Sequence, residues 1–311
     1  MAISPFPMLD REAVAAALPW PALIDAIAAM FRQGCESPLR HRHAVGPDGT
    51  LLLMPAWRAD GFTGVKIVQV NPGNAARGAP AVNATYLLSR ASDGVPVALL
   101  DGGELTDRRT AATSVLAARH LARPDSARLM LLGSGRVAAA LAECYASAFL
   151  LTDIMVWSPR AANAQALAER LAARGLPARA VATPTFDADI IAAATLATRP
   201  LIPGAALRPG THLDLVGAYR PDMREADGPA LARATLVVDT RAGAMAEAGD
   251  IVQALAEGAI GPAHVVAELA ELCRGTHPGR RQVDEITAFK SVGWAGEDLA
   301  AAMLAAGTLP A

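Results

Sequence analysis

The sequence is poor in several residue types, and each shortage excludes a class of protein. Charged residues make up 19% of the 311 residues and aromatic residues 4%, whereas hydrophobic residues make up 52%. This composition is too apolar for a disordered chain and indicates a folded globular protein. The formal net charge is -2 at pH 7, so the chain lacks the excess of Lys and Arg that a nucleic-acid groove requires. We therefore expect a small-molecule partner and no nucleic acid.

Cysteine is also scarce. Cys35, Cys144 and Cys273 are widely separated, so they form neither an even disulfide framework nor a CxxC pair for metal or redox chemistry. This usage is typical of a reducing compartment. We expect a cytoplasmic protein whose three cysteines are inert core residues.

Long apolar runs are absent from the N-terminal region. Residues 1–31 have no basic segment, and Pro19, Pro21 and Asp25 interrupt their apolar stretches. These stretches are too short to span a membrane. We expect neither a signal peptide nor a membrane anchor.

The first 110 residues carry an α+β pattern. One helix is expected after Asp10 and through Leu18, and a second after Pro21 and as far as Phe31, before Gly34. Short apolar segments separated by Gly, Pro, Asn and Asp predict an antiparallel sheet. These segments are residues 50–57, 64–71, 81–89 and 95–100.

The pattern changes at Thr106, where strand-like and helical segments begin to alternate. Alternation of this kind predicts βαβ units and a Rossmann-type doubly wound parallel sheet. Helices are expected at 106–122, from 136 and at 161–174, and strands at 128–133, 153–158, 188–195, 211–217 and 235–240. Residues 284–307 predict a strand end, a tight turn and a closing helix that packs back on the first domain. We therefore divide the chain into one domain of residues 1–110 plus 295–311 and another of residues 111–294.

A glycine-rich turn lies at the start of the second domain. Residues 129–141, LMLLGSGRVAAAL, carry G-x-G-x-x-A directly after an apolar strand. In this motif Gly133 makes a tight turn, Gly135 lets the backbone approach a pyrophosphate, and the small Ala138 lets the helix lie close to the strand. The helix N-terminus then offers N–H groups to the phosphates. A purely structural turn is the alternative, but the position inside a βαβ run favours dinucleotide binding.

The next strand bears on the choice of dinucleotide. It ends in residues 154–160, IMVWSPR, without the Asp or Glu that usually binds the ribose 2′-OH of NAD. Ser158 and Arg160 offer a hydroxyl and a cation to a 2′-phosphate, so NADP(H) is favoured over NAD(H). Alternatively, Arg160 is a solvent-exposed residue in the first turn of the following helix.

Lys66 is unusual because it stands between Val65 and Ile67 in a predicted strand. Lysine is seldom buried without a partner. Protection of an edge strand is one explanation, and the other is that Lys66 binds a substrate carboxylate or donates to a reacting nitrogen. Arg109 adds a planar fork suited to a carboxylate or phosphate, and one of the pair Arg108 and Arg109 is expected to face solvent.

Two further groups attract attention without supporting a site. His41 and His43 alternate, which places both on one face if the segment is extended, but without a third ligand at suitable spacing we expect no metal site. Asp222, Glu225 and Asp227 lie in the segment RPDMREAD, residues 220–227. Such a mixed-charge stretch after a strand is typical of a solvated loop and a helix cap.

Seven segments in a fixed order connect the sequence to a known family. They are LLLMPAW from Leu51, GVKIVQVNPGN from Gly64, GVPVALLDGGELTDRRTAATSVLAARHLA from Gly94, LLGSGRVA from Leu131, RPGTHLDLVGAYRPDMREAD from Arg208, EAGDI from Glu247 and FKSVG from Phe289. On these motifs the sequence resembles the ornithine cyclodeaminase and mu-crystallin superfamily over nearly its whole length. The resemblance implies a homodimer, in which the first domain and the C-terminal helix supply the dimer interface and substrate pocket and a Rossmann domain holds NAD(P)(H).

The resemblance also implies roles for individual residues. Lys66 matches the family's active-site lysine, and Arg109 matches the arginine that meets the substrate carboxylate or a cofactor phosphate. Arg40 is a third match, with Arg42 as the neighbouring alternative. Thr110 would lie by the phosphates, Val216 and Gly217 near the nicotinamide, and Ser291 at its carboxamide. The full set of implied cofactor-binding residues is Thr110, Gly133, Ser134, Gly135, Arg136, Val137, Ser158, Arg160, Thr195, Val216, Gly217 and Ser291.

Two departures from the family pattern separate its branches. Cyclodeaminases of the family carry a glutamate and an aspartate where this sequence has Leu52 and Tyr219. The pattern therefore favours the ketimine reductases, which transfer hydride from NAD(P)H to C2 of a cyclic imine carboxylate such as Δ1-pyrroline-2-carboxylate. An ornithine cyclodeaminase and a non-catalytic mu-crystallin-like binding protein are the alternatives.

Overall fold

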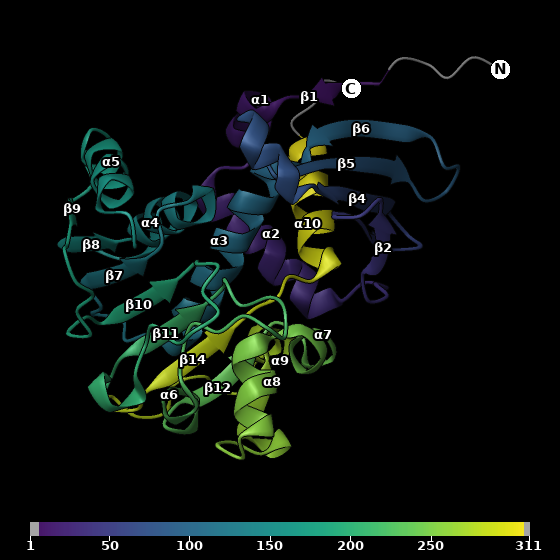
Figure 1. Ribbon diagram of the computed structural model, residues 1–311. Helices are drawn as coiled ribbons and strands as arrows, with labels where there is room; N and C mark the ends of the chain where they lie inside the picture. Colours follow the sequence, from purple (N-terminus) through teal and green to yellow (C-terminus); the bar gives the residue numbers. More distant parts are fainter. Residues whose placement is uncertain (1–5, 308–311) are drawn as a thin grey trace. The chain divides into compact units, whose positions relative to one another are not determined.

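The computed structural model of the protein describes residues 6–307, which form two compact units (Figure 1). One unit comprises the chain up to Arg109 together with the segment from Trp294, and the other runs from Thr110 to Gly293. The first boundary falls inside helix α3 (Gly102–Leu121), and the second falls directly before helix α10 (Ala295–Ala306). The division made from the sequence differs from each boundary by one residue.

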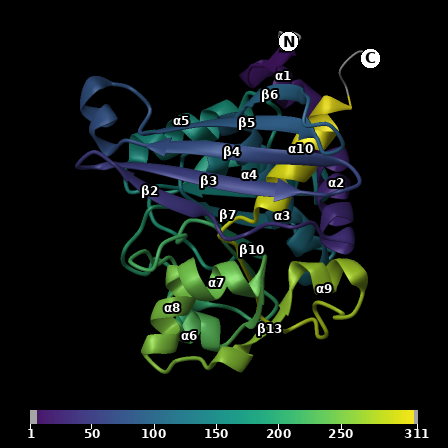
Figure 2. The ribbon, with the colours of Figure 1, turned by 90° about the vertical axis from the view of Figure 1, so that its right-hand side faces the viewer.

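The first unit contains a six-stranded sheet in the order β1-β6-β5-β4-β3-β2 (Figure 2). Its neighbouring strands are antiparallel, except that β1 pairs in parallel with β6. The four strands predicted from the sequence are confirmed, and two short strands, β1 and β2, were not predicted. The strands are β1 (Met8–Leu9), β2 (His41–Val45), β3 (Gly49–Trp57), β4 (Phe62–Val70), β5 (Val82–Arg90) and β6 (Pro96–Asp101).

Both N-terminal helices form as the capping signals predict. The Asp10 carboxylate accepts a hydrogen bond of 2.9 Å from the Ala13 N–H and caps α1 (Arg11–Ala17). Helix α2 (Trp20–Gln33) ends at Gly34, whose φ of 79° suits glycine. It begins at Trp20 and not after Pro21, because proline is well accommodated in the first turn of a helix.

Helix α10 completes the first unit although it is the last element of the chain. It contacts α2 and crosses β3 and β4, as Figure 2 shows. Leu299 on this helix is fully buried, and the Trp294 ring at its start lies 4.8 Å from the Phe31 ring of α2, centroid to centroid. The predicted return of the closing helix to the first domain is confirmed.

Lys66 lies on the covered face of the sheet. In β4 the residues Gly64, Lys66 and Val68 are buried, and the residues between them are more exposed. Lys66 stands opposite Met54 of β3 and Tyr86 of β5. Because β4 is an interior strand, edge protection does not explain this lysine.

The second unit is built on an eight-stranded parallel sheet in the order β13-β12-β14-β11-β10-β7-β8-β9. From β7 the chain adds strands first on one side and then on the other, so the order reverses between β7 and β10. This is the doubly wound arrangement expected from the sequence. The strands are β7 (Arg128–Leu132), β8 (Asp153–Trp157), β9 (Ala178–Ala180), β10 (Ile190–Ala193), β11 (His212–Leu215), β12 (Thr235–Val238), β13 (Val265–Glu268) and β14 (Thr287–Lys290).

Helices flank this sheet, with α4 and α5 beside β7 and β8 in Figure 1. The predicted helices after β7 and β8 are confirmed, whereas the short helices α6 to α9 were not predicted. Helix α3 begins at Gly102, four residues before the predicted start, because the Asp101 carboxylate accepts a hydrogen bond from the Glu104 N–H and caps the earlier turn. The helices are α4 (Arg136–Ala148), α5 (Ala161–Ala172), α6 (Gly228–Ala232), α7 (Arg241–Glu247), α8 (Gly249–Ala256) and α9 (Leu269–Arg274).

Within residues 6–307 no single helix combines the length and apolar character needed to cross a membrane. Helices α1 and α2 reach that length and composition only when taken together, and they are bent by 76° with respect to each other.

The burial of α10 predicts how a substitution in this helix changes the free energy of unfolding. Replacing Leu299, which is fully buried, with Ala should lower the free energy of unfolding by about 2–5 kcal/mol, because it leaves a cavity against the sheet. The matched change Leu150→Ala, at a side chain that is 93% exposed, should cost less than about 0.5 kcal/mol. Urea unfolding followed by circular dichroism measures both, and equal effects would contradict the packing described here.

Candidate functional site

Most of the cofactor-binding residues expected from the sequence lie at the carboxyl ends of the parallel strands. Gly133 directly follows β7, Ser158 follows β8, Val216 follows β11 and Ser291 follows β14. Thr195 stands two residues beyond the end of β10. In open α/β sheets ligands bind outside the carboxyl ends of the strands, where the strand order reverses. Here that point is the end of β7 and β10.

The glycine turn has the backbone geometry that its motif requires. Gly133 has a φ of 123°, and a Cβ there would lie 2.5 Å from the Ala194 carbonyl oxygen. Gly135 is the N-cap of α4, and nothing lies within 4 Å of the position that its Cβ would take. Ala138 is buried in the first turns of α4. The N-terminus of α4, with Arg136 and Val137 as its first residues, is therefore open to an anionic ligand.

The ends of β7 and β8 each carry one hydroxyl group, and a cation follows β8. The hydroxyls of Ser134 and Ser158 are 3.1 Å apart, and Ser158 is buried. Arg160 is exposed and is the N-cap of α5. Ser158 and Arg160, the residues expected to bind a 2′-phosphate, therefore follow the carboxyl end of a strand, as the glycine turn does.

Glu225 holds two of the loops at this edge. Its carboxylate accepts hydrogen bonds from the Thr195 N–H at 2.7 Å, from the Thr195 hydroxyl at 2.8 Å and from the Gly217 N–H at 2.6 Å. A side chain at position 217 would clash with Thr195 and with the Glu225 carboxylate, so glycine is required there. Glu225 therefore ties the loop after β10 to the loop after β11.

The expectation of a solvated loop was wrong for Glu225, which is fully buried. It held for the flanking acids, because Asp222 is exposed and pairs with Arg220, and Asp227 is the N-cap of α6. Burial raises the pKa of Glu225 to about 7, while the Lys290 charge and the hydrogen bonds from Thr195 lower it. The local sequence contains no signal that distinguishes Glu225 from its acidic neighbours.

Lys290 is the cation at the centre of a buried acidic cluster. Its ammonium lies 3.2 Å from Asp250, whose other carboxylate oxygen accepts from the Glu225 and Ala226 N–H groups. Asp239 accepts from the N–H groups at positions 292 and 293, directly after β14. The charge of Lys290 lowers the pKa of Glu225 and Asp239, which burial raises. We call Glu225, Asp239, Asp250 and Lys290 the Lys290 cluster.

Lysine usage is the sequence signal that could have identified this cluster. The chain has 26 arginines but only two lysines, Lys66 and Lys290. Both are buried, at 2% and 0% exposure, and each pairs with a buried aspartate. An ammonium is compact and an arginine fork is not, so the two residues are not interchangeable in a closed site.

The second lysine belongs to a cluster in the first unit. The Lys66 ammonium donates a hydrogen bond of 2.8 Å to Asp298 Oδ1 and lies 2.7 Å from Oδ2. Arg109 reaches the same Asp298 oxygen through Nε at 2.9 Å, and its Nη1 lies 2.5 Å from Glu297. All four side chains are buried. We call Lys66, Arg109, Glu297 and Asp298 the Asp298 cluster.

The electrostatics of this cluster bring the three predicted catalytic residues together. The pKa of Lys66 is lowered from 10.5 to about 8: burial lowers it most, the positive charges of Arg109 and Arg40 also lower it, and Asp298 opposes them. Arg40 is therefore close enough to act on Lys66. The acidic members Glu297 and Asp298 were not identified from the sequence.

Arg108 departs from expectation, because neither arginine of the pair faces solvent. Its Nε donates to the Leu18 carbonyl at 3.0 Å, and its guanidinium lies 3.9 Å from the centroid of the Trp20 ring. Arg109 turns to the Asp298 cluster. Thr110, the next residue of α3, is buried.

The remaining sequence candidates lie apart from these clusters or are more exposed. His41 and His43 are exposed on β2, and Tyr219 is 38% exposed. Cys144 is buried as expected, but Cys35 and Cys273 are only partly buried. Among residues 6–307 no group of three or more His, Cys, Asp or Glu side chains could hold a metal ion.

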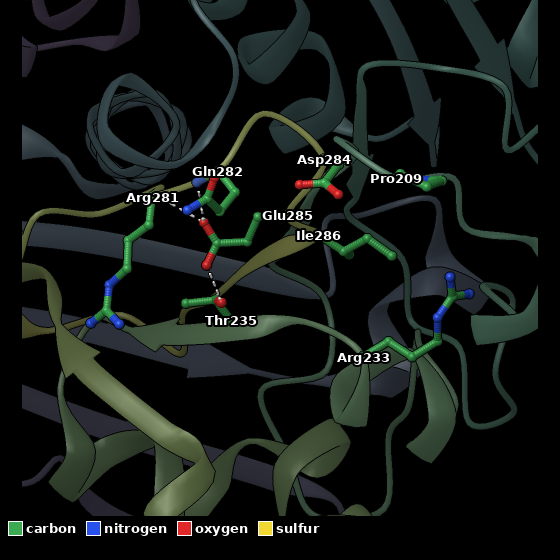
Figure 3. A pocket seen from close by; sticks show the side chains of 8 residues that line it. All are labelled: Pro209, Arg233, Thr235, Arg281, Gln282, Asp284, Glu285 and Ile286. Carbon is green, nitrogen blue, oxygen red and sulfur yellow. Dashed lines mark hydrogen bonds between the residues drawn. The ribbon is translucent and has the colours of Figure 1, made fainter.

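A cavity of about 470 Å³ opens at the opposite ends of the parallel strands (Figure 3). Thr235 begins β12, and Ile286 directly precedes β14, so the cavity lies at the amino ends of these strands. It is lined by Pro209, Arg233, Thr235, Arg281, Gln282, Asp284, Glu285 and Ile286. None of the expected site residues is among them.

Comparisons with known proteins agree with this arrangement. The model of the ornithine cyclodeaminase/mu-crystallin family matches residues 7–307. A Δ1-pyrroline-2-carboxylate reductase of Paracoccus denitrificans is 40% identical and covers 88% of this chain and 89% of its own length. The ketimine reductase mu-crystallin of Rattus norvegicus is 35% identical, with 82% and 79% covered. The structure of Thermococcus litoralis Δ1-pyrroline-2-carboxylate reductase with NADH and L-proline has a TM-score of 0.92 at 32% identity, with 97% of each chain covered.

The pairing of Lys290 with Asp250 predicts how a substitution of this lysine changes stability. Lys290→Met should destabilise the protein by about 3–5 kcal/mol, because Asp250 then remains buried without its cation. Asp250→Asn combined with Lys290→Met should recover part of the loss. Thermal unfolding measures both variants, and a loss below about 1 kcal/mol for Lys290→Met would contradict a buried charge pair.

Proposed function

The chain belongs to the ornithine cyclodeaminase/mu-crystallin family, and on that premise we propose that it is an NAD(P)H-dependent reductase of a cyclic ketimine carboxylate. Δ1-Pyrroline-2-carboxylate, which would give L-proline, is the substrate we propose first. Relatives that carry the names of Δ1-pyrroline-2-carboxylate reductase and ketimine reductase support this choice.

The observation that carries the proposal is the meeting of Lys66 and Arg109 on one buried carboxylate. An ammonium and a guanidinium held side by side, with the positive charge of Arg40 nearby, form a receptor for a carboxylate group. The receptor suits a substrate with one carboxylate beside its reacting carbon. We assign binding of that carboxylate to Lys66, Arg109 and Arg40.

The carboxyl edge of the parallel sheet fits a dinucleotide. Gly135 leaves open the space that a Cβ would fill, and the N-terminus of α4 faces that space. Gly133 and Ser134 would meet the pyrophosphate, and Ser158 and Arg160 a 2′-phosphate. Thr195, Val216, Gly217 and Ser291 follow the strands on the nicotinamide side of the turn.

Reduction of the C=N bond adds two electrons and two protons to the substrate. A reduced nicotinamide dinucleotide supplies two electrons and one proton as hydride, and a proton completes the amine. A protonated imine is already electrophilic, so the task of the side chains is to hold the carboxylate and thereby orient C2. Orientation of this kind is a large part of rate enhancement when one reactant is fixed by the protein.

Two positions favour reduction over the cyclodeaminase reaction. Leu52 is a partly buried residue of β3, and Tyr219 is partly exposed after β11. By the family pattern, cyclodeaminases carry carboxylates at both positions. The presence of the complete cation set Lys66, Arg109 and Arg40 favours an enzyme over a binding protein.

A direct assay tests the proposed reaction. Purified protein with NADPH and Δ1-pyrroline-2-carboxylate should oxidise NADPH, followed as loss of absorbance, whereas ornithine with NAD should release little ammonia. Lys66→Met should lower kcat/KM by about 30-fold or more, since truncating one partner of a buried charge pair costs about 2–5 kcal/mol. Affinity for NADPH should change little. Rapid ammonia release without imine reduction, or full activity of the variant, would contradict the proposal.

The role proposed for Arg160 has its own test. Arg160→Ala should weaken binding of NADPH about 10-fold to 100-fold, because it removes a charge-assisted hydrogen bond worth about 1.5–3 kcal/mol. Binding of NADH, which has no 2′-phosphate, should change little. Fluorescence titration with each nucleotide measures the difference, and equal losses would show that Arg160 does not contact the 2′-phosphate.

A further inference from the structure

Asp298 occupies a position that neither the sequence motifs nor the family resemblance single out. One of its oxygens accepts hydrogen bonds from both Lys66 and Arg109, at 2.8 and 2.9 Å, and the other lies 2.7 Å from the Lys66 ammonium. We propose that Asp298 is a positioning residue that holds the Lys66 ammonium and the Arg109 guanidinium side by side as one receptor for the substrate carboxylate. This inference rests on the proposed function.

The sequence of α10 indicates that Asp298 is there for these cations. The helix, AGEDLAAAMLAA, has Glu297 and Asp298 as its only charged residues, and both are fully buried. Ala or Leu at these positions would suffice for packing, as at the other buried positions of α10. Both acids stand in the first turn, where the helix dipole favours a carboxylate. Glu297 contacts Arg109, and Asp298 contacts both cations.

The groups around Lys66 shift its pKa in opposite directions. Asp298, from α10, favours the protonated ammonium. Arg109 of α3 and Arg40, which precedes β2, disfavour it, as burial does. Tyr86 of β5 lies opposite Lys66 and close to Asp298 and Cys35, and its buried hydroxyl has no hydrogen-bond partner among the described residues.

The balance makes the protonation of Lys66 sensitive to Asp298. The pKa of Lys66, about 8, already lies close to physiological pH, and the Asp298 charge raises it. Without the Asp298 charge the pKa falls, so Lys66 loses its proton at a lower pH. An uncharged Lys66 no longer attracts a carboxylate. An aspartate that served only the packing or the dipole of α10, without contact to the ammonium, would leave this titration unchanged.

The scarcity of lysine permits a direct measurement. In protein labelled with ¹³C at the lysine Cε, the spectrum should contain two lysine signals, since the chain has two lysines. The signal that disappears in Lys66→Arg belongs to Lys66. In the unaltered protein it should titrate near pH 8. In Asp298→Asn the midpoint should fall by about one to three pH units, the usual effect of a neighbouring opposite charge.

Glu297→Gln provides the matched control. It removes the adjacent carboxylate of the same helix, which is bonded to Arg109, whereas Asp298 is bonded to the Lys66 ammonium itself. The Lys66 midpoint should therefore stay within about half a pH unit of the unaltered value, well inside the shift expected for Asp298→Asn. Equal midpoints in Asp298→Asn and the unaltered protein would overturn the inference.

The unaltered protein supplies a second measurement should Asp298→Asn fail to fold. Pyrrole-2-carboxylate, a planar five-membered ring carboxylate, should raise the Lys66 midpoint because its negative charge comes beside the ammonium. Pyrrole-2-carboxamide, which has no charge, should not. A Lys66 signal that responds to neither compound, or to both alike, would overturn the receptor assignment.

Kinetics separate this inference from the proposed function. In Asp298→Asn the KM for the imine should rise about 10-fold or more at pH 7.5, as expected when a charge-assisted contact is lost. The alkaline limb of kcat/KM should move with the Lys66 midpoint, and activity should recover at lower pH. If no imine is reduced but Asp298→Asn still shifts the Lys66 midpoint, the proposed function fails while the pairing of Asp298 with Lys66 stands. If imine is reduced and the alkaline limb does not move, the inference about Asp298 fails alone.

Discussion

Pairing of buried cations with carboxylates is the constraint on which both functional regions depend. An ammonium removed from water loses its hydration, and only a carboxylate at contact distance with further hydrogen bonds offsets that cost. Lys66 meets this condition through Asp298, and Lys290 meets it through Asp250. Because an unpaired member of either pair would be strongly unfavourable, each pair constrains the chain segments that supply its two residues.

The segments joined in this way lie far apart in the sequence. Lys66 and Asp298 are separated by 232 positions, and Arg109 and Asp298 by 189. The closing helix α10 is therefore part of the proposed carboxylate receptor as well as part of the packing of the first unit. In the second unit Glu225 and Asp250 connect the loops after β10 and β11 to the helix that begins at Gly249. Hydrogen bonds to the buried carboxylates of Glu225 and Asp250 therefore fix the loops that a dinucleotide would contact.

Glycine meets a different requirement at the same edge. Gly133 has a backbone conformation that other residues rarely adopt, and Gly217 leaves room for Thr195 and the Glu225 carboxylate. These requirements are local in character, so the motif around Gly133 could be recognised from its neighbours in the chain. The requirement at Gly217 comes partly from Glu225, eight residues away, and becomes visible only once both loops are folded.

The sequence by itself determined the parallel sheet, the antiparallel sheet, the longer helices and the glycine turn. These features depend on apolar periodicity, capping residues and glycine, which act over a few neighbouring residues. It also singled out Lys66, because a lysine between apolar strand residues is conspicuous, and Arg109 through the family resemblance. Only the tertiary structure decided that Asp298 pairs with these two cations and that Glu225 is buried against Thr195 and Gly217. In the sequence, Asp298 has the local pattern of a helix start and Glu225 that of a surface loop. Other segments of the chain bury these two carboxylates and supply their hydrogen-bond partners.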